Sequence, residues 1–273
     1  MGVVSAIRVT LVVDNHASEG LRSEHGLSFL VETDVGSVMF DTGQSDAWFH
    51  NLIALGREPR SIKAIAISHG HYDHTGGLVK AVREAPGAQC FTHPACFEPK
   101  YARSTGETRY IGMPLEVVSG KTAFKPNTSV TEILRGVVLS GEIPLRTSIS
   151  FDSRFVTEGS KSQQDTFEDE QCMIIRHGDS TAVLVGCAHR GLENNLLAAM
   201  DVAGVDRIDL LAGGFHLGNA SEDKLDSLAD FLKNADIGQI ACCHCTGFGA
   251  YEYLRLKLGH RVTLARAGVS WEV

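Results

Sequence analysis

The sequence predicts an α/β fold, an αββα sandwich in which two mixed β-sheets pack face to face between outer helices. Each half of the chain opens with apolar, β-branched runs and continues with strands that alternate with helical patterns. A histidine, cysteine or aspartate follows strand after strand, and a sandwich with its site at one edge explains that recurrence. The composition, 43% apolar and 21% charged over 273 residues, is that of a soluble globular protein with a sizeable core.

In the first half, apolar runs bounded by turn residues predict strands, and runs with helical spacing predict helices. The strands are expected at 7–13, 27–32, 37–40, 62–67 and 88–92, and the helices at 47–55 and 78–83. Residues 33–36, Thr-Asp-Val-Gly, join the second and third strands as a hairpin. Gly56 ends the first helix.

Residues 94–165 are the least regular part, and we expect an irregular insertion or lid there within a single domain over 1–273. Short β-like pieces recur at 115–118, 130–134 and 137–139, and the polar residues 158–169 predict a mobile loop. Between 94 and 125 the cations outnumber the glutamates five to three; they are Lys100, Arg103, Arg109, Lys121 and Lys125. Against a net charge of −8, this basic excess indicates an anionic substrate, with a solvated surface as the alternative.

The second half returns to regular alternation of strands and helices. Strands are expected at 171–176, 181–185, 208–212, 237–242 and 262–265, and helices at 192–203 and 251–258. A third helix begins after Ser221, a good N-cap followed by Glu222 and Asp223 in the first turn. His189, His216 and His244 each follow one of these strands, and we rank His189 and His244 above His216 as metal ligands.

The stretch Ser68-His69-Gly70-His71-Tyr72-Asp73-His74 places four potential metal ligands within six residues, directly after an apolar run. Buried without a metal, three histidines this close leave several ring nitrogens without partners. Imidazole and carboxylate together suit one or two divalent ions, Zn first, with Fe or Mn as alternatives. The competing interpretation is a His-rich solvated loop.

This H-x-H-x-D-H pattern resembles the metallo-β-lactamase fold superfamily, which has the αββα architecture. The resemblance implies that His69 and His71 bind one metal, and that Asp73 and His74 bind a second in a two-metal clamp. It also implies that His189 completes the first position and His244 the second. Asp41, after the strand at 37–40, corresponds to a residue that supports the ligands by hydrogen bonding.

The sequence departs from the superfamily pattern where most members carry a bridging aspartate. Cys187 falls at that place, and His189 lies two residues beyond it. Cys187 as a thiolate, Asp169 or Glu170 are the candidates to replace the missing ligand. The run Cys242-Cys243-His244-Cys245 has a second interpretation as a structural zinc knuckle, which the opposite faces of adjacent strand residues disfavour.

These departures resemble one subgroup, the 7,8-dihydropterin-6-methyl-4-(β-D-ribofuranosyl)aminobenzene-5′-phosphate synthase-like proteins. The resemblance covers about 7–265 and rests on six segments: 24–28 (Glu-His-Gly-Leu-Ser), 41–43 (Asp-Thr-Gly), 68–77, 186–189 (Gly-Cys-Ala-His), 213–217 (Gly-Gly-Phe-His-Leu) and 244–247 (His-Cys-Thr-Gly). A shared fold does not by itself fix the reaction.

The metal ligands predict a metal-dependent hydrolase with a metal-activated water. The basic excess between 94 and 125 makes a phosphoester or another small anionic substrate the leading class, with a lactam or lactone as the alternative. Asp73 would steer the proton of that water, and His216 and His25 are candidates for substrate contact or proton transfer. One alternative is a synthase that joins a dihydropterin pyrophosphate to an aminobenzene ribosyl phosphate and releases pyrophosphate. Another is a non-catalytic metal or ligand sensor.

The composition also bounds the partners and the compartment. A net charge of −8 disfavours nucleic acid as a partner, and no apolar run approaches the length of a membrane span. The odd number of cysteines, seven, does not suggest a disulfide framework. The first residues have no cleavable secretory pattern, so we expect a cytoplasmic protein. The sequence leaves the oligomeric state open.

Overall fold

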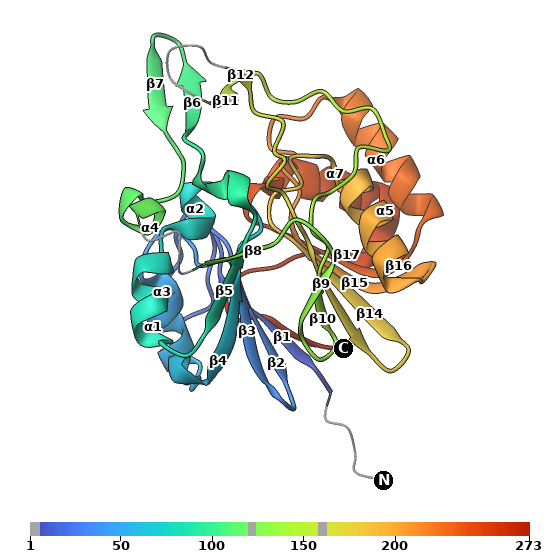
Figure 1. The fold of residues 1–273 in the computed structure, drawn as a ribbon. Coiled ribbons are helices and arrows are strands. Elements are labelled where there is room, and N and C mark those ends of the chain that lie inside the picture. Colours follow the sequence, from blue (N-terminus) through green and yellow to red (C-terminus); the bar gives the residue numbers. More distant parts are fainter. Residues whose placement is uncertain (1–5, 120–123, 158–162) are drawn as a thin grey trace.

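A computed structural model describes residues 6–119, 124–157 and 163–273. Two seven-stranded sheets pack face to face with helices on both outer sides, which confirms the predicted αββα sandwich (Figure 1). The first sheet has the order β18-β1-β2-β3-β4-β5-β8 and the second the order β17-β16-β15-β14-β13-β10-β9. Both sheets are mixed, because each joins parallel strands to antiparallel ones.

The strands of the first sheet are β1 (Arg8–Val13), β2 (Ser28–Thr33), β3 (Gly36–Phe40), β4 (Ile62–Ala66), β5 (Gln89–Thr92), β8 (Phe124–Pro126) and β18 (Ser270–Glu272). Those of the second are β9 (Thr131–Leu134), β10 (Val137–Leu139), β13 (Met173–His177), β14 (Ser180–Val185), β15 (Arg207–Gly214), β16 (Asp236–Cys243) and β17 (Val262–Leu264). The helices are α1 (Ala47–Ala54), α2 (Tyr72–Thr75), α3 (Leu78–Glu84), α4 (Leu115–Ser119), α5 (Leu192–Ala203), α6 (Glu222–Asn234) and α7 (Phe248–Leu258).

The core consists of three apolar layers, one between the sheets and one beneath each set of helices. In β2, Phe29 faces the layer between the sheets, whereas its neighbour Leu30 faces α1 and α3. Successive strand residues point to opposite faces, so nearly continuous apolar strands bury both sides of the sheet. On the far side, Leu228 and Leu232 of α6 pack onto the second sheet, and the Ser221 hydroxyl caps that helix by accepting from the Lys224 amide.

The strand directions bring the polar strand ends to one edge. β3, β4 and β5 run parallel, and so do β14, β15, β16 and β17. The residues that follow these strands therefore lie at the carboxyl ends of both sheets, where ligand sites of α/β folds occur. A small third sheet, β12-β11-β6-β7, projects beyond α2 at the top of Figure 1. Its strands are β6 (Lys100–Ser104), β7 (Glu107–Tyr110), β11 (Phe155–Thr157) and β12 (Gln163–Gln164).

The described parts of residues 94–165 contain more regular structure than their sequence indicates. β8, β9 and β10 extend the two large sheets, and the third sheet also comes from this stretch. The strand expected at 115–118 is wrong, because α4 occupies Leu115–Ser119 and the carbonyl of Pro114 accepts from the amide of Val117. A proline just before the first turn favours a helix, and two valines concealed that signal.

Part of these expectations cannot be compared with the structure. Residues 1–5, Lys121 and residues 158–162 of the expected mobile loop lie outside the described ranges, and the single domain over 1–273 stays a prediction. Of the helices that the structure describes, none combines the length and the apolar character that crossing a membrane requires.

Candidate metal centre

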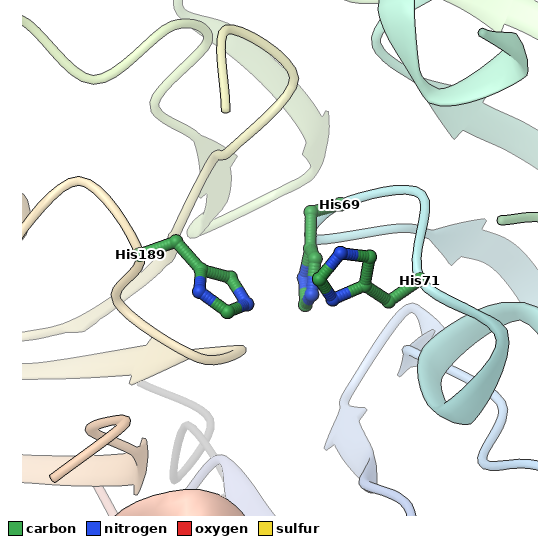
Figure 2. Close-up of side chains that lie close together, drawn as sticks. All are labelled: His69, His71 and His189. Atoms are coloured by element: carbon green, nitrogen blue, oxygen red, sulfur yellow. The ribbon is translucent and has the colours of Figure 1, made fainter. Parts of the chain in front are cut away.

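His69, His71 and His189 form a cluster of three imidazoles. His69 and His71 lie in the loop between β4 and α2, His189 lies between β14 and α5, and Figure 2 shows the three rings pointing toward one another. One ligand atom from each lies within 4.8 Å of the others. All three residues are buried, and each Nε2 atom has no hydrogen-bond partner. Buried polar atoms are rarely left without partners, so three converging lone pairs fit a metal ion.

Neighbouring groups fix the orientation of these rings. The Ser68 hydroxyl lies 2.9 Å from Nδ1 of His69. Phe167 stacks on His189, with ring centroids 4.0 Å apart and an angle of 9° between the planes. The Glu170 carboxylate accepts hydrogen bonds from the backbone amides of His189 and Arg190. The Ser68 hydroxyl thus orients His69 through the nitrogen that does not face the cluster, and Phe167 and Glu170 hold the ring and the backbone of His189.

Burial also sets the protonation state of the cluster. It lowers the pKa of His71 to about 3 and that of His69 and His189 well below the usual value for histidine. The three rings are therefore neutral near pH 7, which is the state in which imidazole binds a metal. Burial raises the pKa of the Glu170 carboxyl to about 7.

Asp73 is the centre of a second cluster, together with His25 and His244. Its Oδ2 atom lies 3.2 Å from Nε2 of His25, 3.3 Å from Nε2 of His244 and 3.9 Å from Nε2 of His74. Burial alone would raise the pKa of Asp73, but His74, His244 and His25 hold it well below its usual range. A carboxylate and imidazoles together are ligand types that suit a divalent ion, so this cluster is a second candidate site for one.

His74 lies between the two clusters. Its Nδ1 atom is 2.7 Å from Oδ2 of Asp41, and its Nε2 atom is 3.2 Å from Sγ of Cys187. Burial would lower the pKa of His74, but the carboxylates of Asp41 and Asp73 raise it to about 9. A cation that binds at Nε2 therefore competes with a proton.

The three candidates for the missing bridging aspartate lie in different surroundings. Cys187 shares ligand groups with His69 and His74 and with His244 and Cys245. Asp169 instead accepts from the Gly70 amide at 2.7 Å and pairs with the ammonium of Lys100 at 3.2 Å. The Glu170 carboxylate accepts hydrogen bonds from the backbone amides of His189 and Arg190. Within the described residues, neither carboxylate belongs to a ligand group.

The geometry also argues against a zinc knuckle at 242–245. Cys242 packs into the layer beneath α5 to α7, whereas Cys243 packs into the layer between the sheets. Their sulfurs lie on opposite faces of β16, so this run cannot surround one ion with its cysteines.

His25 and His216 lie on either side of the clusters. The side chain of His25 is 52% exposed and contacts Asp73, and the His216 ring lies 4.4 Å from that of His189. A pocket of about 730 Å³ opens there, lined by His189, His216 and Cys245 together with residues of the 148–154 segment and the start of α6. His216 therefore lies where a substrate in the pocket can reach it, whereas His25 does not line this pocket and is reached from the solvent-exposed side of Asp73.

The cations that line this pocket are Arg154 and Lys224, not those expected from residues 94–125. Lys100 is buried between Asp165 and Asp169. Arg109 lies over the Tyr72 ring, and Lys125 donates to Gln89. Asp152 pairs with Arg154 and Glu193 with Lys224, so the pocket is close to charge balance.

Backbone strain is concentrated at this edge of the sandwich. In the described part of the chain, five residues other than glycine have positive φ: Asp41 (61°), Phe167 (50°), Ala188 (55°), His216 (47°) and His244 (48°). Each such residue costs about 1–3 kcal/mol and persists only where its surroundings over-determine it. Asp14, which was not among the predicted site residues, helps to hold His244 in this conformation, because its carboxylate accepts a hydrogen bond from the His244 amide at 2.7 Å. Asp14 comes directly after a strand, as Asp41 does, and this position is the sequence feature that could have identified it.

We expect Asp41→Asn to weaken metal binding by about 10–100-fold, as for other residues that orient ligands. Asparagine tolerates positive φ but lacks the charge that holds His74 and accepts from the Ser68 amide and hydroxyl. Competition with a fluorescent chelator measures the affinity. Asp46→Asn, at the partly exposed residue just before α1, is the control, and equal affinity for both variants would contradict a role for Asp41.

Comparisons with known proteins show the family to which this chain is related. The family model of the metallo-beta-lactamase superfamily matches residues 22–156. The structure of Tm1679, described as a metal-dependent hydrolase of the beta-lactamase superfamily, has 32% identity and a TM-score of 0.84. That alignment covers 98% of this chain and 99% of Tm1679.

Two further relatives extend the comparison. The 7,8-dihydropterin-6-methyl-4-(beta-D-ribofuranosyl)-aminobenzene-5′-phosphate synthase of Methanocaldococcus jannaschii is 27% identical over an alignment of 269 positions that covers 92% of this chain and 91% of the relative. Zn²⁺-bound PqqB from Methylobacterium extorquens, at 15% identity and a TM-score of 0.58, covers 97% of this chain and 100% of its own and shares the fold. With the Tm1679 match, these findings confirm the resemblance seen in the sequence: the chain belongs to the metallo-beta-lactamase superfamily.

Proposed function

We propose that the protein is a metal-dependent hydrolase of a phosphoester or another small anionic substrate. The observation that carries the proposal is the convergence of three buried, unpartnered Nε2 atoms from His69, His71 and His189 beside the pocket. His74, Asp73 and His244 would hold a second ion, with Cys187 next to them. When bound, a divalent cation, Zn²⁺ first and Fe²⁺ or Mn²⁺ as alternatives, polarises the scissile bond and acidifies water.

The residues of the chain supply position and proton transfer. The Asp73 carboxylate, in contact with His25, His244 and His74, would orient the attacking water and steer its proton. The His216 ring lines the pocket, so this side chain would carry a proton to the leaving group. The rings of Phe155 and Phe167, both near His71, exclude bulk water from the cluster.

A second candidate is the synthase reaction that releases pyrophosphate. The name of the relative from Methanocaldococcus jannaschii favours this reaction. A pocket of about 730 Å³ also has room for a substrate that extends well beyond the bond that is broken. Phe151 offers aromatic surface in that pocket for a flat ring system. In this reaction the same ligands would stabilise the pyrophosphate leaving group.

One experiment separates these functions. Protein purified without chelator is analysed for bound metal, then incubated with chromogenic phosphodiesters and, separately, with the two dihydropterin-pathway substrates. Turnover of a diester that a chelator abolishes supports the hydrolase, and pyrophosphate release without hydrolysis supports the synthase. Bound metal without turnover in either assay would favour the metal or ligand sensor over both enzymes.

Arg154 lines the pocket beside its partner Asp152, and we expect it to recognise the anionic group of the substrate while keeping that pairing. Replacement by glutamine removes a charge-assisted hydrogen bond, so KM for a phosphodiester should rise about tenfold or more, with less change for a neutral ester. Steady-state kinetics of both substrates measure this. Arg146→Gln, which removes a surface cation paired with Asp201, is the control. An unchanged KM in Arg154→Gln would contradict anion binding at this wall.

A further inference from the structure

Cys187 and Cys245 bring two sulfur atoms together at the rim of the metal centre. Cys187 follows β14 and Cys245 follows β16, so the pair spans the intervening strand β15. Their Sγ atoms lie 3.1 Å apart, and all seven cysteines of the chain are free thiols. The contact is thus a pair of unbonded sulfurs at hydrogen-bond distance.

The surrounding backbone holds the two sulfurs in this contact. Ala188 and His244, each next to one of the cysteines in sequence, both have positive φ, and the His216 amide donates to Sγ of Cys245 at 3.3 Å. Gly214 leaves the space for that sulfur, because a Cβ at this position would lie 2.6 Å from it. The short distance therefore follows from two constrained loops and not from two freely rotating side chains.

The two sulfurs differ in their access to solvent. Cys245 lines the large pocket, whereas Cys187 is 3% exposed and lies behind it. The other five cysteines are buried and do not line the described pockets. A small oxidant that enters the pocket therefore meets Cys245 first, with Cys187 directly behind as a second sulfur. An accessible cysteine beside a resolving one is the arrangement of redox-sensitive pairs.

We propose that Cys187 and Cys245 are an oxidation site, which hydrogen peroxide converts reversibly into a disulfide. The Cys245 sulfur attacks one peroxide oxygen, the O–O bond breaks, and the products are a sulfenic acid and one water. The Cys187 sulfur then attacks the Cys245 sulfur, the S–S bond forms, and the hydroxyl leaves as a second water with the remaining thiol proton. The two sulfurs together lose two electrons, and the peroxide oxygens gain them.

The disulfide would change the metal centre directly. Bond formation requires the sulfurs to approach by about 1 Å, to roughly 2.05 Å. The Cys187 sulfur, 3.2 Å from Nε2 of His74, would then no longer be available as a thiolate ligand. Oxidation would thus reduce metal binding beside His74 while leaving His69, His71 and His189 in place.

Intact-mass spectrometry of the full chain, as purified and after treatment with peroxide, tests the proposal. We expect the loss of two hydrogens per chain, the loss of two of the seven thiols in a titration under denaturing conditions, and recovery of both thiols with dithiothreitol. Peptide mapping should show Cys187 linked to Cys245. Seven intact thiols after treatment, a linkage between other cysteines, or only irreversible addition of oxygen would overturn it.

Variants sharpen the result without an activity assay. In Cys187→Ser, peroxide should add one oxygen to Cys245 as a sulfenic acid, and no disulfide should form. Cys242→Ala, a change in the core beneath α5 to α7, should still lose two thiols on oxidation. A disulfide that persists in Cys187→Ser would overturn the assignment. The peptide map of the unmodified chain decides the question if either variant fails to fold.

Discussion

Replacement of His189 by alanine is expected to remove the ion held by the three-imidazole cluster and to lower turnover more than about 100-fold. His69 and His71 alone offer two ligand atoms, and a catalytic metal requires three from the protein. The expected loss exceeds the 10–100-fold that residues behind the ligands contribute. Elemental analysis of protein purified without chelator measures the metal, and the same preparation is assayed for phosphodiester hydrolysis.

The matched control is His93→Ala. Like His189, His93 is buried and follows a strand, in this case β5 of the first sheet. Its ring contacts the Ala95 amide and Glu142, and it belongs to no ligand group among the described residues. It should keep its full metal content. If His189→Ala also keeps the metal and the rate, the cluster in Figure 2 is not the metal site.

The local motif is the part of the site that the sequence predicts best. His69 to His74 lie within a few residues, so their proximity hardly depends on the rest of the fold. His189 and His244 were expected because each follows an apolar strand, and parallel strands place such residues at a common edge. The geometry brings both to that edge, His189 beside His71 and His244 beside Asp73.

Contacts between segments distant in sequence were not predictable in the same way. Nothing in the sequence around Lys100 indicates that it is buried against Asp165 and Asp169, residues more than sixty positions away. A lysine among other cations is typical of a solvated or anion-binding surface, and only the burial of Lys100 against the two carboxylates reverses that interpretation. The Cys187–Cys245 contact depends equally on the register of β14, β15 and β16.

Lys100→Met is expected to destabilise the fold by about 3–5 kcal/mol, because it leaves two buried carboxylates without their cation. Lys100 is 2% exposed, and its ammonium lies 3.0 Å from Asp165 and 3.2 Å from Asp169. These carboxylates raise the pKa of Lys100 further above its usual value although burial opposes this, so the ammonium stays charged. At constant metal concentration, the melting temperature should fall by about 10 °C.

The same change tests how the third sheet is connected to the metal centre. Lys100 lies at the start of β6, and its partner Asp169 accepts from the amide of Gly70, between His69 and His71. If this chain of contacts positions the ligand loop, Lys100→Met should also weaken metal binding in protein that remains folded.

Adding Asp165→Asn to Lys100→Met removes one of the two carboxylate charges that lost their cation, so the double variant should be more stable than the sum of the single changes predicts. Lys257→Met, which breaks an exposed pair with Asp226, should change neither quantity. A Lys100→Met variant as stable as Lys257→Met would mean that the buried carboxylates take up protons or solvent without cost, and the third sheet would then have no electrostatic connection to the metal centre.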